Sequence, residues 1–216
     1  MPAPRRFATA CGFVGPPITI GAIVLATVVA PAEAFSWRGH ALSDLGRPDT
    51  NTFWLFNGGL ILGGLVGSAF VWRVWVASRN RLEAAGAAVL AVAVVGLIGV
   101  GVFFLEHTTY YGSRDFHGLA ALVTFAASPL APVLYGIGAI RADDRQWGLA
   151  SVVLGAVIVA SWVGWIAVAG SIASRPYFAV QELLAAVLFS GWIVAFAWRL
   201  WVDTTVPAVT DSRSIR

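Results

Sequence analysis

The chain contains no lysine, a single cysteine and a single methionine, and only 12% of its 216 residues are charged. The lone cysteine, Cys11, excludes an intrachain disulfide and a metal site built from cysteine thiolates. The formal net charge of +3 is small, and we expect no nucleic-acid partner. Scarce charge, 58% hydrophobic residues and a mean hydropathy of +0.79 are typical of a membrane protein and exclude an ordinary soluble domain of this length.

Six apolar runs are each long enough to cross a hydrocarbon core of about 30 Å, which takes roughly 20 helical residues. The runs lack the alternation of a barrel strand, and open strands cannot cross lipid, so they are expected to be helices. The sequence therefore predicts an all-α bundle of six transmembrane helices. It would form one integral membrane domain over residues 1–216, with a short flexible tail at 202–216. The expected spans are 8–30, 53–76, 84–105, 117–140, 148–171 and 177–201.

The arginines are distributed unevenly between the two ends of this bundle. Only four fall on the side opposite the termini, namely Arg38, Arg47, Arg114 and Arg175. Because positive charge favours cytoplasmic loops, we predict that the N- and C-termini are cytoplasmic. The short turns on that side hold arginines and carboxylates that we interpret as solvated anchors. Arg5, Arg6, the first run and residues 32–34 together resemble a signal peptide. The run exceeds the 7–15 residues of such a core, so we interpret it as a span.

Polar side chains gather at the outer end of the predicted bundle, and any functional site is expected to face outward. The stretch Phe35–Gly46, between the first two spans, is the densest polar segment. Glu182 lies roughly one turn into the last span, and Asn57 lies about 9 Å into the second at 1.5 Å per residue. Ionisable groups inside a span are costly and usually face the bundle interior or a wet cavity. The candidate catalytic residues are Ser43, Asp44, His117 and Glu182, and the candidate ligand-binding residues are Arg38, Asn57, Glu106, Arg175 and Gln181.

Some of these side chains also have a purely structural interpretation. Glu182 could form an ion pair with Arg175 or Arg38, or contact a histidine, and so close the outer end. Asp115 lies two residues before the fourth span and is interpreted as the N-cap of that helix. The sequence leaves these alternatives open.

The three histidines, His40, His107 and His117, all fall at the outer end, on two different loops. Together with Asp44 or Glu106 they could hold zinc and leave one position open for water, which is the arrangement of a metal-dependent hydrolase. The chain has no helical His-x3-His pair, so spacing alone does not support zinc. We predict no other cofactor.

Small residues recur every fourth position on the second span, at Gly59, Gly63 and Gly67. Such a ladder predicts a face where another helix packs closely. That helix could belong to the same chain, to a second copy in a homodimer, or to a partner membrane protein.

Several of these motifs together resemble a known family. They are Ala-Leu-Ser-Asp-Leu-Gly at 41–46, Phe-Asn-Gly-Gly-Leu at 56–60, and His117 followed by glycine. Over most of the chain they resemble the bacterial and archaeal membrane family called domain of unknown function 998. That family is similar in turn to the Frag1/DRAM/Sfk1 group, whose members carry a comparable Ser-Asp-x-Gly element after the first span. The resemblance implies a six-helix bundle in the cell membrane of a bacterium or archaeon. In the eukaryotic relatives it implies roles in lipid remodelling or membrane trafficking, and it carries no catalytic mechanism.

Three classes of function follow. The first is a lipid-handling protein, enzymatic or not, with a site for lipid headgroups at the outer face. The second is a small-solute transporter. The oily middle of the bundle counts against it, although Pro129 and Pro132 could kink the fourth helix and free backbone carbonyls. The third is a non-catalytic scaffold, sensor or accessory subunit. In it Ser43 and Asp44 cap an ordered turn and Gly46 takes a positive φ.

Overall fold

The computed structural model describes residues 3–169 and 176–203. These residues form six helices that are long and apolar enough to cross a membrane, and they form no strand. The helices are α1 (Ala3–Val29), α2 (Phe53–Ala77), α3 (Arg81–Val102), α4 (His117–Arg141), α5 (Arg145–Ala169) and α6 (Phe178–Val202). Two short 3-10 helices, η1 (Leu42–Gly46) and η2 (His107–Thr109), lie in the connections. The predicted six-helix, multi-pass architecture is confirmed.

The third helix begins and ends three residues earlier than the expected span 84–105. It begins at Arg81 because the Asn80 side chain accepts hydrogen bonds from the backbone N–H groups of Leu82 (3.0 Å) and Glu83 (3.1 Å). These bonds satisfy two of the donors that a helix start leaves free. The first helix begins at Ala3, ahead of the apolar run. Residues 170–171 of the predicted fifth span and residues 204–216 of the predicted tail lie outside the described residues.

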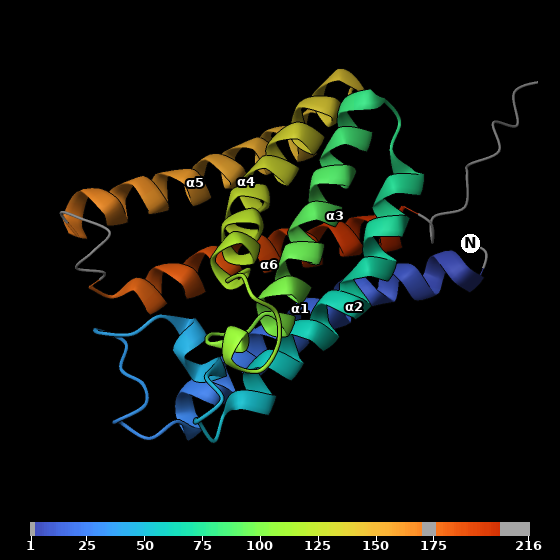
Figure 1. The fold of residues 1–216 in the computed structure, drawn as a ribbon. Coiled ribbons are helices and arrows are strands. Elements are labelled where there is room, and N and C mark those ends of the chain that lie inside the picture. The colour runs from blue at the N-terminus through green and yellow to red at the C-terminus, as the bar shows by residue number, and fades with distance from the viewer. Residues whose placement is uncertain (1–2, 170–175, 204–216) are drawn as a thin grey trace, which may run out of the picture.

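Consecutive helices pack side by side, and α6 lies against α1 (Figure 1). The helix α5 is the outlying member, because it packs chiefly on α4 and contacts α6 much less. Few α5 residues are buried, and three of them, Gly148, Ser151 and Gly155, are small. The interior of the bundle therefore lies among α1, α2, α3, α4 and α6.

The two ends of the bundle differ in their connections. One end, which we call the loop end, carries the connections 30–52 and 103–116. The other, the turn end, carries the short turns 78–80 and 142–144, together with the start of α1 and the end of α6. The loop end corresponds to the predicted outer face. Which end faces the cytoplasm stays a prediction based on the arginines.

The glycine ladder of α2 packs against α1 of the same chain. A Cβ on Gly63 would collide with the Thr19 Oγ1 atom and would lie 3.1 Å from the carbonyl oxygen of Gly15. A Cβ on Gly59 would collide with the Cβ of Ala22. Small residues allow this close approach of two helix backbones. The sequence left three partners open for this face. In the structure, α1 of the same chain packs against it.

An ion-pair network closes the turn end. The Glu83 side chain has 0% of its surface exposed and accepts hydrogen bonds from Arg79 through its backbone N (2.5 Å) and its Nη2 (2.5 Å). Asp144 accepts from Arg79 Nη2 at 3.3 Å and from Arg199 Nη2 at 2.6 Å. The hydrogen bond to Glu83 raises the pKa of Arg79 above its ordinary value. The interpretation of these turns as solvated anchors was wrong for Glu83, because helix packing buries its carboxylate.

Candidate functional site

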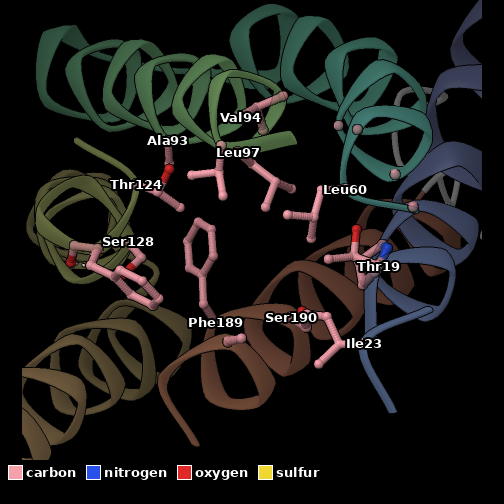
Figure 2. A pocket seen from close by; sticks show the side chains of 18 of the residues that line it. Thr19, Ile23, Leu60, Ala93, Val94, Leu97, Thr124, Ser128, Phe189 and Ser190 are labelled. Carbon is pink, nitrogen blue, oxygen red and sulfur yellow. Dashed lines mark hydrogen bonds between the residues drawn. The ribbon is translucent and has the colours of Figure 1, made fainter. Parts of the chain in front are cut away.

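A cavity of about 120 Å³ occupies the interior of the bundle. Residues of α1, α2, α3, α4 and α6 line it, together with Leu42 and Ser43 of η1, and no α5 residue does. Figure 2 shows Leu97, Thr124 and Phe189 reaching toward the same space from α3, α4 and α6. The cavity thus follows the packing of the bundle, since α5 lies outside the five helices that enclose it.

The lining is polar at the loop end and mostly apolar elsewhere. Ser43, His117 and Glu182 line the loop end of the cavity. Three of the four predicted catalytic residues are therefore brought to one cavity by η1, α4 and α6. Asp44, the fourth, does not line it.

Asp44 and Asn57 instead hold the turn that carries Ser43. The Asp44 carboxylate accepts a hydrogen bond from the backbone N–H of Ala41 (2.8 Å). The Asn57 side chain donates from Nδ2 to the carbonyl of Gly46 (2.9 Å). The capping role expected of Asp44 is thus present, and Asn57 anchors the turn to α2.

Gly46 does not have the positive φ that the sequence predicts, since Gly112 is the glycine with a positive φ in the described part of the chain. Its requirement for glycine is steric. A Cβ on Gly46 would lie 2.6 Å from Asn57 Oδ1 and 2.8 Å from the Phe56 ring. The turn lies directly on α2, and this close approach explains the glycine.

Glu182 joins the start of α6 to the segment Phe35–Gly46. Its Oε2 accepts a hydrogen bond from the backbone N–H of Leu42 at 2.7 Å, and both residues are buried. Two backbone N–H groups at the start of α6 also donate to this segment. Tyr177 N–H donates to the Arg38 carbonyl (3.0 Å), and Ala179 N–H donates to the His40 carbonyl (3.2 Å). These contacts fix the polar end of the cavity across two distant parts of the sequence.

His117 begins α4 and is 7% exposed. Its Nδ1 lies 2.7 Å from the carbonyl oxygen of Phe103, so we assign the proton of a neutral ring to Nδ1. Nε2 is then a hydrogen-bond acceptor. The backbone N–H of His117 donates to Asp115 Oδ1 (3.0 Å), but the N-cap of α4 is Phe116, so the prediction of Asp115 as the N-cap was wrong by one residue.

Ser43 is the neighbouring polar group on the cavity wall. Within the described ranges 3–169 and 176–203, its hydroxyl makes no hydrogen bond with the protein, and it is not enclosed. Ser43 and His117 therefore offer polar groups that the fold itself does not use.

The three histidines do not gather. His107 is 1% exposed, with Nδ1 3.0 Å from the Phe104 carbonyl and Nε2 3.0 Å from the Arg114 carbonyl. His40 accepts a hydrogen bond at Nδ1 from the backbone N–H of Ser36 (3.0 Å). In the part of the chain that the structure describes, no three His, Cys, Asp or Glu side chains lie close enough together to hold a metal ion. The geometry gives no support to the zinc hypothesis.

The predicted ligand-binding residues are dispersed. Glu106 forms a surface ion pair with Arg47 (2.6 Å) that links the two connections of the loop end. Gln181 donates from Nε2 to Ser161 Oγ (2.9 Å) and so links α6 to α5. The Arg38 side chain is exposed, and Arg175 lies outside the described residues.

Four hydroxyl residues that the sequence analysis did not single out also line the cavity, namely Thr19, Thr124, Ser128 and Ser190. Two of them bond to their own helix. Thr124 donates to the Ala120 carbonyl (2.9 Å), and Ser128 donates to the Phe125 carbonyl (3.1 Å). The second bond satisfies the carbonyl that Pro129, which has no N–H, leaves without a helical donor. The sequence signal was a proline one residue after a serine.

Comparisons with curated proteins and with solved structures each gave no match. A family model does match, over residues 13–199, and it spans all six helices and the Ser-Asp-Leu-Gly turn. The chain therefore belongs to the family described as "Protein of unknown function (DUF998)".

Proposed function

We propose that this multi-pass membrane protein binds one membrane lipid inside its bundle. The headgroup would lie beside Ser43, His117 and Glu182, and a hydrocarbon chain would lie along the apolar part of the cavity. The observation that carries the proposal is the distribution of the lining, which is polar at one end and mostly apolar along its length. A cavity with apolar walls stays dry or takes an apolar ligand.

The length of the cavity supports a chain-bearing ligand. Its lining on α6 extends from Glu182 to Ile193, and its lining on α4 extends from His117 to Ser128. Each stretch covers about 16 Å at 1.5 Å per residue. Half of a hydrocarbon core of about 30 Å is about 15 Å, the depth of one leaflet. The lining thus spans about the depth of one leaflet, and because the cavity of about 120 Å³ is smaller than a whole lipid, the helices would move apart to admit the chain with its headgroup at the loop end.

The polar groups indicate which headgroups would bind. His117 presents Nε2 as an acceptor, and the Ser43 hydroxyl can accept or donate. A headgroup that donates hydrogen bonds, such as a hydroxyl or a primary amine, would satisfy both. This chemistry favours neutral or zwitterionic lipids over a phosphate monoester.

We also propose in which membrane the protein lies and from which leaflet its lipid comes. The arginine distribution supports cytoplasmic termini, which makes the loop end extracytoplasmic and its lipid one of the outer leaflet. We propose the cell membrane of a bacterium or archaeon as its location. The similarity to the Frag1/DRAM/Sfk1 group, based on Ser43 and Asp44, stays a prediction, as does catalysis by Ser43 or His117.

A second candidate function is a non-catalytic scaffold or accessory subunit. Asp44 and Asn57 favour it, because both make structural hydrogen bonds with the turn. The two functions differ in one testable respect, since a scaffold has no need of a lipid in its interior.

A pair of tryptophan variants on α6 separates them. Ser190 lines the cavity, whereas Val187, on the same helix, is 45% exposed on the outer surface. We expect the unchanged protein and Val187→Trp to retain about one lipid per chain in native mass spectrometry after purification in mild detergent. Ser190→Trp would lose most of it, because the indole fills the cavity.

The reverse results would contradict the proposal. Equal lipid retention by Ser190→Trp and Val187→Trp would place the lipid on the outer surface. A third variant, Ser43→Ala, tests the headgroup end. It should change which headgroups are retained while leaving the total amount near that of the unchanged protein.

A further inference from the structure

A second candidate site lies at the opposite end of the bundle, around Arg73 of α2. Arg73 is 6% exposed, and its Nε is buried with no hydrogen-bond partner. Among residues 3–169 and 176–203 it forms no ion pair, and its two terminal nitrogens make no hydrogen bond. Those terminal nitrogens are not enclosed, so they reach accessible space. A buried charge without a partner is costly, and such groups are normally paired.

The surroundings of Arg73 are positively charged. The charge of Arg5 repels that of Arg73, and the nearby Asp203 attracts it. Arg5 and Arg6 are exposed near the start of α1, whose first turn has no acidic residue. The positive end of the helix dipole adds to this potential.

Three carboxylates of the turn end have other partners. Glu83 pairs with Arg79, and Asp144 pairs with Arg79 and Arg199. Asp203 lies 3.8 Å from Arg199 Nε. The network therefore neutralises Arg79 and Arg199, while Arg73 has no ion-pair partner among the described residues and Asp203 offsets its charge only in part.

We propose that Arg73, together with Arg5, binds the phosphate group of an anionic phospholipid at the turn end. Arginine binds phosphate through two parallel N–H donors, and the two terminal nitrogens of Arg73, which reach accessible space, supply such a pair. Arg73 precedes the end of α2 by four residues, about 6 Å along the helix, which is a depth near the headgroups. Basic pockets between transmembrane helices on the cytoplasmic side are suited to acidic headgroups. This site is independent of the lipid cavity, since it lies at the other end of the bundle and binds another chemical class.

The test uses the full-length protein in mild detergent, titrated separately with phosphatidylglycerol, phosphatidylcholine and inorganic phosphate. Bound lipid is counted by native mass spectrometry. We expect phosphatidylglycerol to bind about tenfold or more tightly than phosphatidylcholine, because both carry the same phosphodiester but the choline ammonium cancels its charge and is repelled by the arginines. Arg73→Gln should abolish this preference. Arg73→Lys, which keeps the charge but loses the paired donors, should keep only part of it.

Arg81→Gln is the matched control, because Arg81 is an exposed arginine at the same end of the bundle. The proposal is overturned if Arg73→Gln keeps the full preference, or if Arg81→Gln loses as much. It is also overturned if the unchanged protein does not distinguish the two lipids, a result that needs no variant to fold. Displacement of phosphatidylglycerol by millimolar phosphate would identify a free anion as the ligand, and persistence of the lipid would identify the headgroup.

Discussion

Replacing Glu182 with leucine removes the acceptor that the buried N–H of Leu42 uses at 2.7 Å. Leu42 is 5% exposed, so water cannot readily replace that acceptor. Leaving a buried donor unsatisfied costs about 1–3 kcal/mol. Glu182→Gln keeps an oxygen acceptor but loses its charge, and a neutral hydrogen bond is roughly half as strong as a charge-assisted one. We therefore expect a smaller loss of about 1 kcal/mol for Glu182→Gln.

Amide hydrogen exchange measures this junction directly. In Glu182→Leu, the Leu42 amide should exchange about tenfold or more faster, since 1.4 kcal/mol corresponds to a factor of ten. Leu184→Ala is the control, because Leu184 lies on the same helix and is 43% exposed. The reasoning is refuted if Glu182→Leu leaves the Leu42 amide as protected as in the unchanged protein. It is also refuted if Leu184→Ala accelerates that amide equally.

Two further predictions concern helix packing and the turn end. Gly63→Ala should lower the free energy of unfolding by about 1–3 kcal/mol, because the new Cβ would run into α1. Gly58→Ala should be neutral or stabilising, since no atom lies within 4 Å of its Cβ position. Equal losses of stability for the two variants in denaturant titrations would contradict the close packing of Gly63 on α1. Glu83→Ala should cost about 3 kcal/mol, the lower part of the range for breaking a buried pair, because the side chain of Arg79 is 43% exposed and can be hydrated. Thermal unfolding measures this loss; the exposed Glu33→Ala should change the stability little, and a Glu83→Ala variant as stable as Glu33→Ala would refute the role of the network.

The six helices could be predicted from the sequence because length and apolarity alone determine which segments can cross a bilayer. The shifted start of α3 could not, because it depends on the hydrogen bonds of Asn80 rather than on hydropathy. Similarly, the arginine–carboxylate turns look solvated in the sequence. Packing of α3 against α4 places Glu83 in the interior, and a Cβ on Gly138 would lie 2.6 Å from the Glu83 backbone N.

The candidate site could be predicted only in part. The order of spans and connections placed Ser43, His117 and Glu182 at one end of the bundle, but their common cavity depends on which helices are neighbours. Side-chain chemistry alone could not show that the adjacent residues Ser43 and Asp44 have different roles. In the structure, the Asp44 carboxylate accepts a hydrogen bond from the N–H of Ala41, while Ser43 lines the cavity. The sequence also grouped His107 with His117, because both are histidines at the same end of the bundle. In the structure, each ring nitrogen of His107 instead lies within hydrogen-bond distance of a backbone carbonyl.

The central claim, a lipid chain within the bundle, is tested most directly by photocrosslinking with a lipid that carries a diazirine near the end of its acyl chain. The lipid is incorporated in nanodiscs, and adducts are mapped by peptide mass spectrometry. We expect adducts at cavity residues such as Leu97 and Phe189, and their loss in Ser190→Trp. Adducts confined to outward-facing residues such as Leu122 (65% exposed) and Val187, with none at Leu97 or Phe189, would contradict it.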